Sequence, residues 1–155
     1  MRMVSEGIEV EVPQGWDGEI FRRRDKEIRA GGRKAEEQPV LHMGNFALPP
    51  DRGDFGSGAV DVMQSENLLV VLFEYEPDAA ETALFSHRGI PEVIPEDFSP
   101  SQMQQPIEGQ SGAQYFFHQG GRAFCLYIVM GSHGRRQQLI PELRQVLQTI
   151  RLETR

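Results

Sequence analysis

LLVVLFEY at residues 68–75 and YFFHQGGRAFCLYIVM at residues 115–130 are the stretches of sequence that decide the fold. Neither reaches the ~18 consecutive apolar residues that a membrane-spanning helix requires. Both are too apolar to lie on a surface, so they predict central strands of one sheet that is covered on both faces. Gln119-Gly120-Gly121 predicts a hairpin turn between strands at residues 110–118 and 122–130.

Shorter strands are predicted on the N-terminal side of these runs. Residues 8–12 alternate apolar and acidic side chains, which is the period-two pattern of a half-buried strand. Asp17-Gly18 has the composition of a tight hairpin turn, so the chain is expected to return as a strand over residues 19–24. A further strand is expected at residues 40–46. Short helical turns are expected at residues 59–64, at residues 78–85 and after Ser99-Pro100.

The last element is the clearest helix in the sequence. Its apolar stripe consists of Leu139, Leu143, Val146, Leu147 and Ile150. Proline inside a helix costs about 3 kcal/mol, so Pro141 is expected within the first turn. Together these elements predict a single α+β domain over residues 1–155. Its mainly antiparallel sheet of five to six strands is expected to pack against the C-terminal helix.

Both ends of the chain resemble a known fold. GIEVEVPQGW at residues 7–16 resembles the opening of small bacterial domains with a PsbP-like α/β sandwich, and CLYIVMG followed by a helix ending in LQTIRLE is similar to their ending. The whole chain resembles uncharacterised small proteins of actinobacteria and their relatives. Members of the PsbP-like fold include accessory subunits of photosynthetic complexes and binders of small GTPases. The resemblance therefore implies an accessory role, by analogy of fold alone.

Charge is distributed unevenly along this chain, whose net charge is −7. Residues 22–38 carry seven basic and four acidic side chains, a net charge of +3, while residues 66–97 carry eight acidic side chains against Arg88 alone. The acidic total disfavours general nucleic-acid binding, because contacts with phosphate dominate that affinity. The basic segment is expected to be a solvated loop or, alternatively, a surface for a protein partner. That candidate surface comprises Arg22, Arg23, Arg24, Arg29, Arg33 and Lys34. The glycine-rich loop at residues 51–58 is a second candidate surface.

The reactive side chains form no recognisable catalytic, metal or cofactor motif. The four histidines are not spaced as HxH or HExxH, and Cys125 has no second cysteine, so neither a metal nor a cofactor is expected. Cys125 is expected to be an inert core thiol. An alternative interpretation places a pocket between the sheet and residues 76–108, with His42, Glu74 and His118 as its polar groups.

The leading hypothesis is therefore a non-catalytic accessory or protein-interaction module. The alternative is a small-ligand-binding protein or an enzyme that uses the pocket beside residues 76–108. The sequence shows neither the apolar core of a signal peptide nor a run of membrane length, so a cytoplasmic protein without membrane insertion is the default expectation. The partner, the oligomeric state and the exposure of Trp16 are left open by the sequence.

Overall fold

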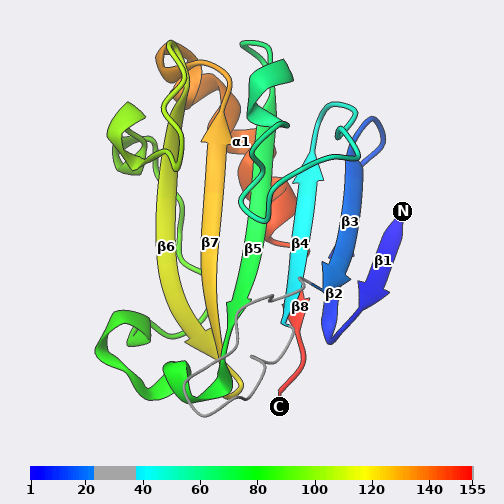
Figure 1. The fold of residues 1–155 in the computed structure, drawn as a ribbon, viewed down its shortest axis with the longest axis vertical. Helices are drawn as coiled ribbons and strands as arrows, with labels where there is room; N and C mark the ends of the chain where they lie inside the picture. Colours follow the sequence, from blue (N-terminus) through cyan, green and yellow to red (C-terminus); the bar gives the residue numbers. More distant parts are fainter. Residues whose placement is uncertain (23–37, 155) are drawn as a thin grey trace.

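The computed structural model describes residues 1–22 and 38–154, and its two antiparallel sheets and C-terminal helix confirm the α+β class (Figure 1). The larger sheet has the strand order β3-β4-β5-β7-β6 and the smaller one has the order β1-β2-β8. The strands are β1 (Arg2–Ser5), β2 (Ile8–Glu11), β3 (Asp17–Arg22), β4 (Pro39–Gly44), β5 (Leu68–Tyr75), β6 (Ser111–Gln119), β7 (Arg122–Met130) and β8 (Arg151–Leu152). The helix is α1 (Arg136–Leu147).

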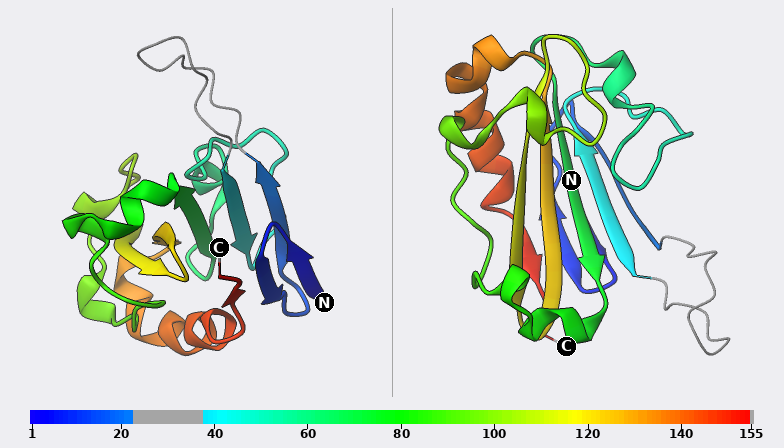
Figure 2. Two further views of the ribbon diagram at one scale, coloured as in Figure 1. Left: turned by 90° about the horizontal axis from the view of Figure 1, so that it is seen from below. Right: turned by 60° about the vertical axis from the view of Figure 1, so that its left-hand side comes forward.

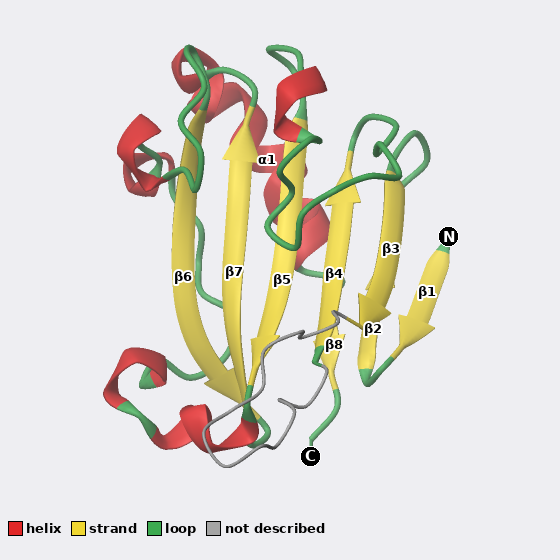
Figure 3. Ribbon diagram, in the orientation of Figure 1, coloured by secondary structure: helices red, strands yellow, loops and turns green. Residues whose placement is uncertain are grey.

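Short 3-10 turns connect these elements and gather around the ends of the larger sheet (Figure 3). They are η1 (Val60–Val62), η2 (Pro77–Glu81), η3 (Ala83–Phe85), η4 (Pro95–Asp97), η5 (Pro100–Gln102) and η6 (His133–Arg135). The helical turn expected at residues 59–64 is the shorter η1. The helix expected at residues 78–85 is instead the two turns η2 and η3, which are separated by an extended Thr82.

The central strands are buried on both faces of the larger sheet, as expected. Seven of the eight residues of β5 and all nine of β7 are buried. One face packs against α1 and the smaller sheet, and we call this the α1-side core (Figure 2). The other face is covered in large part by residues 45–67, and we call this the loop-side core. Two covered faces explain why these strands read as continuous apolar runs.

The β6–β7 hairpin confirms the predicted turn. Gln119 pairs with Arg122, and the two residues between them, Gly120 and Gly121, have φ angles of 60° and 78°. Two successive positive φ angles are what a tight hairpin turn of the type I′ class requires, and glycine adopts them at little cost.

The predicted hairpin at Asp17-Gly18 is wrong, because both residues belong to β3. The turn lies earlier, where the Trp16 amide donates to the Pro13 carbonyl at 3.0 Å and Gly15 adopts a φ of 85°. The strands on either side of this turn join different sheets. The prediction of one sheet is corrected accordingly to two.

The predicted apolar stripe of the C-terminal helix is confirmed for Leu139, Leu143, Val146 and Leu147, which are all buried on α1. Ile150 is buried too, but it follows the end of the helix at Leu147. The prediction for Pro141 is wrong: α1 begins at Arg136, which places Pro141 in the second turn. A proline there leaves the Gln137 carbonyl without its usual helical donor. Both residues lie on the exposed side of the helix, where water can replace the lost hydrogen bond.

Candidate functional site

The structure does not bring His42, Glu74 and His118 together. Side chains alternate between the two faces of a strand, and Leu41, the neighbour of His42, packs in the α1-side core. His42 therefore points to the loop side. His118 lies on the same loop side, since its neighbour Phe117 belongs to the α1-side core. Glu74 continues the β5 positions that face α1, so the three side chains do not converge on one pocket.

Glu74 on β5 instead forms a buried ion pair with Arg122 on β7, two positions along from Phe124, which directly faces Glu74 in the sheet. The Arg122 Nε donates to Glu74 Oε2 at 3.0 Å, and Nη2 donates to Oε1 at 2.6 Å. The remaining N–H groups of Arg122 reach three backbone carbonyls: those of Glu6, Gly7 and Glu153. All five donors of the guanidinium are thus satisfied. The pair joins the larger sheet to the β1–β2 turn and to the segment after β8.

Gly7 makes this close approach feasible. Its φ angle is 71°, and a Cβ atom at this position would lie 2.8 Å from Arg122 Nη1. Glycine is therefore required both by the backbone conformation and by the space that the guanidinium occupies.

His42 belongs to a second internal network, on the loop side of the sheet. Its Nδ1 accepts a hydrogen bond from Arg52 Nε at 3.0 Å, so its proton resides on Nε2, which donates to the Asp54 carbonyl at 2.7 Å. Arg52 also donates from Nη2 to Glu19 Oε1 at 2.6 Å. Burial lowers the pKa of His42 from 6.5 to about 4. A neutral, fully engaged imidazole holds the loop against the sheet.

The glycine-rich loop at residues 51–58 is part of the cover of the loop-side core. Phe55 stacks on Phe73 with ring centroids 4.5 Å apart. A Cβ atom at Gly56 would lie 2.5 Å from Leu69 Cδ2, so the loop backbone rests directly on the sheet. The predicted second interaction surface is therefore anchored by core packing.

Three further side chains named from the sequence, those of His118, Cys125 and Trp16, are also engaged in the fold. His118 Nδ1 hydrogen-bonds the Phe85 carbonyl at 2.6 Å. Burial raises the pKa of the Cys125 thiol to about 12, which keeps it protonated at neutral pH and inert as a nucleophile. Trp16 is half-buried against the α1-side core, and its Nε1 donates to Glu142 Oε1 on α1 at 3.1 Å.

The basic surface predicted near the N-terminus falls largely outside the described residues. Arg22 is the last residue of β3, and its Nε donates to Glu6 Oε2 at 2.9 Å. The other members, Arg23, Arg24, Arg29, Arg33 and Lys34, lie in the part of the chain that the structure does not describe.

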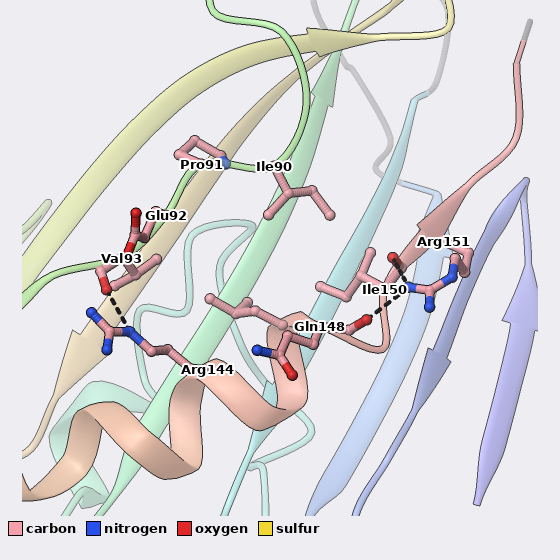
Figure 4. A pocket seen from close by; sticks show the side chains of 9 residues that line it. Ile90, Pro91, Glu92, Val93, Arg144, Gln148, Ile150 and Arg151 are labelled. Atoms are coloured by element: carbon pink, nitrogen blue, oxygen red, sulfur yellow. Dashed lines mark hydrogen bonds between the residues drawn. The ribbon is translucent and has the colours of Figure 1, made fainter.

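An open groove lies between α1 and the segment at residues 90–93 (Figure 4). Its volume is about 600 Å³. We call it the α1 groove, and its lining residues are Ile90, Pro91, Glu92, Val93, Arg144, Leu147, Gln148, Ile150 and Arg151. Apolar side chains thus alternate with two arginines, one glutamine and one glutamate. The groove borders the 76–108 segment, but its polar residues differ from those that the sequence suggested.

The two arginines of the groove are held in place by neutral backbone carbonyls. Arg144 Nε donates to the Val93 carbonyl at 3.0 Å, and Arg151 Nη1 donates to the carbonyls of Gln148 and Ile150 at 2.7 and 3.1 Å (Figure 4). Among the described residues, neither guanidinium lies within 4.0 Å of a carboxylate oxygen. Four other arginines of this same part of the chain do pair with glutamates: Arg2, Arg22, Arg52 and Arg122.

Sequence reasoning missed this groove because three separate segments build it. The available signal was the excess of arginine near the C-terminus, where residues 122–155 carry six arginines and two glutamates. Arg144 and Gln148 are four positions apart and Arg151 follows three later, so a helical reading would have aligned them on one side. Only the packing of residues 90–93 against α1 turns that side into a groove.

Comparison of the chain with protein-family models, with curated proteins and with solved structures found no match. No helix in the described part of the chain is long and apolar enough to cross a membrane. Within residues 1–22 and 38–154, no group of three or more His, Cys, Asp or Glu side chains is placed to hold a metal ion.

Proposed function

We propose that this protein is a non-catalytic accessory module that binds a partner protein through the α1 groove. The observation that carries the proposal is the pair of arginines, Arg144 and Arg151, which line the groove and, among the described residues, form no ion pair with a carboxylate. A charged group that is oriented yet unneutralised gains more from an incoming ligand than one that is already paired.

The internal networks support binding over catalysis. A catalytic acid or base must reach a bound substrate and exchange a proton with it. Glu74 and His42 are fully buried and engaged by Arg122 and Arg52, so their contacts serve the fold. The arginines that do reach the groove carry planar guanidinium groups, whose several N–H donors are suited to hold an anion.

The accessory role also agrees with the PsbP-like resemblance of the two chain ends, which is an analogy of fold. That analogy names no partner and no contact residue. We place the partner site in the α1 groove on the evidence of its two arginines.

Binding of a small ligand in the same groove is the second candidate function. A volume of about 600 Å³ lies within the range of roughly 300–1,000 Å³ that small-molecule sites occupy. The open shape and the location between a helix and an irregular segment favour the protein partner, because small-molecule sites usually enclose most of the ligand surface.

Site-specific photo-crosslinking tests the proposal. A benzophenone amino acid replaces Gln148, which lines the groove, and in a matched protein it replaces Gln137, which is exposed on α1 outside the groove. In extract of the source organism, we expect a discrete crosslinked protein with the probe at position 148 that is absent or much weaker with the probe at position 137. Equal crosslinking at both positions, or none at position 148, would overturn the proposal.

A further inference from the structure

We infer that the partner presents an acidic segment with aliphatic side chains, which lies along the α1 groove and places its carboxylates on Arg144 and Arg151. This inference rests on the proposed function and names the chemistry of the partner. It follows from the charge, the pre-orientation and the apolar walls of the groove.

Arginines follow the whole seam between α1 and the segment before β6. Arg136 Nη1 donates to the Phe98 carbonyl at 3.3 Å, as Arg144 donates to that of Val93. With Arg151, these residues form a stripe of three guanidiniums that bind backbone carbonyls. A carbonyl orients a guanidinium without cancelling its charge, so the stripe remains positive in a chain whose net charge is −7.

The arginines of the groove are also prepared to bind a carboxylate. Holding a long side chain in one conformation costs conformational entropy on binding, and existing hydrogen bonds reduce that cost. Arg144 uses only its Nε in the contacts it makes within the described residues, which leaves both terminal nitrogens as donors. Carboxylate oxygens are the acceptors that match a guanidinium in charge and in geometry.

The walls of the groove favour aliphatic side chains next to those carboxylates. Ile90 and Pro91 are half-buried and lie on the side opposite α1, while Ile150 lies on the other side (Figure 4). Leu147, the last residue of α1, also lines the groove and adds to its apolar surface. Contact with Ile90 and Pro91 would remove their remaining apolar surface from water.

A peptide fits these observations better than a nucleic acid. Glu92 lines the groove, and Glu96 and Asp97 follow in the η4 turn, which contacts α1, so a continuous polyanion would meet repulsion beside the arginines. A short segment with one or two carboxylates can contact the arginines and avoid the acidic surroundings. Glu92 then limits the affinity, because its charge opposes the ligand.

A random heptapeptide library displayed on phage tests the inference without assuming a sequence. The target is the full wild-type chain, and the best enriched peptide is synthesised and measured by fluorescence anisotropy. We expect enriched peptides that combine Asp or Glu with Leu, Ile or Val. The synthetic peptide should bind Arg144→Gln/Arg151→Gln about tenfold more weakly than the wild type. Its binding to the wild type should weaken with added salt, and its binding to Glu92→Gln should be tighter than to the wild type.

The matched control is Arg88→Gln/Arg135→Gln. It removes two exposed arginines that do not line the groove, so it changes the net charge by the same amount as Arg144→Gln/Arg151→Gln does. We expect the affinity of this control variant for the synthetic peptide to stay near that of the wild type. Enriched peptides without an acidic excess would overturn the inference, as would equal weakening in the two double variants. A wild-type dimer that salt and the groove substitutions dissociate would also overturn it, by assigning the groove to a second copy.

The outcomes separate this inference from the proposed function. If a partner crosslinks at position 148 but the selected peptides are not acidic, the proposed binding function stands and the inference of an acidic partner segment is contradicted. If position 148 yields no crosslink, the proposed function fails, and the acidic-segment inference fails with it.

Discussion

Arg122 and Glu74 form a two-point ion pair in the interior of the protein, with N···O distances of 3.0 and 2.6 Å. Their side chains are 3% and 0% exposed. Because the same guanidinium also binds the carbonyls of Gly7 and Glu153, this one side chain ties both sheets together. A buried arginine of this kind depends on its counterion, since an unpaired charge in the interior is strongly unfavourable.

Replacing Glu74 with Gln should therefore destabilise the protein severely. The substitution keeps the shape of the side chain but leaves the buried charge of Arg122 uncompensated, and the expected loss in the free energy of unfolding is about 3–5 kcal/mol. Urea denaturation at pH 7 measures it, with the exposed Glu81→Gln as a control that should change little. A loss for Glu74→Gln no greater than that of the control would contradict the structural role of the pair.

Two glycines with similar backbones allow a test of the space around Arg122. Gly7 and Gly15 have φ angles of 71° and 85°, so alanine is strained at either position, by about 1–2 kcal/mol. At Gly15 a Cβ atom would have no neighbour within 4 Å, whereas at Gly7 it would lie 2.8 Å from Arg122 Nη1. We expect Gly7→Ala to destabilise clearly more than Gly15→Ala in chemical denaturation. Equal losses would show that the guanidinium can move aside without cost.

His42 should make the stability of the protein depend on pH. The pKa of His42 in the folded protein is about 4, below the ordinary value of 6.5, so between these values the unfolded chain binds a proton that the folded one does not. Stability is therefore retained above pH 6.5 and falls as the pH decreases to about 4, by up to roughly 3 kcal/mol from this residue. Urea denaturation at several pH values measures the slope. His42→Gln should have a shallower slope across this window, and an unchanged slope would contradict the account.

The packing of α1 is tested by truncating its most buried side chain. Leu143 is fully buried in the α1-side core, and Leu143→Ala should lower the free energy of unfolding by about 2–5 kcal/mol. Gln145→Ala, on the exposed side of the same helix, should stay within about 0.5 kcal/mol of the wild type. A loss for Leu143→Ala as small as that of Gln145→Ala would mean that α1 is not held by this core.

The parts of the fold that were predictable are those with a strong local signal. The strand bounds at residues 68–75 and 122–130 are confirmed because continuous apolar runs have sharp ends. The hairpin turn at Gly120-Gly121 is confirmed because its conformation demands glycine. The division into two sheets was not predictable, since β1 is short and carries polar side chains, and the two residues of β8 pair with Ile8 and Glu9 from the opposite end of the chain.

The candidate site was beyond the reach of sequence patterns for a related reason. His42, Glu74 and His118 were grouped because each is an ionisable residue on an apolar strand, but the sheet places Glu74 and the histidines on opposite faces. The α1 groove depends on Val93 and Arg144 meeting across 51 positions of the chain. A contact of that range leaves no periodic trace in the sequence.

The most direct test of the α1 groove compares how much of the partner three proteins retain. The three proteins are the wild type, Arg144→Gln/Arg151→Gln and Arg88→Gln/Arg135→Gln. Each is immobilised at equal density and incubated with native extract. Mass spectrometry then quantifies how much each retains of the partner that was identified by crosslinking at position 148. We predict that the control variant retains this partner as well as the wild type does, and that the groove variant loses most of it. Equal retention by all three proteins would contradict the claim that the partner is bound by these two arginines.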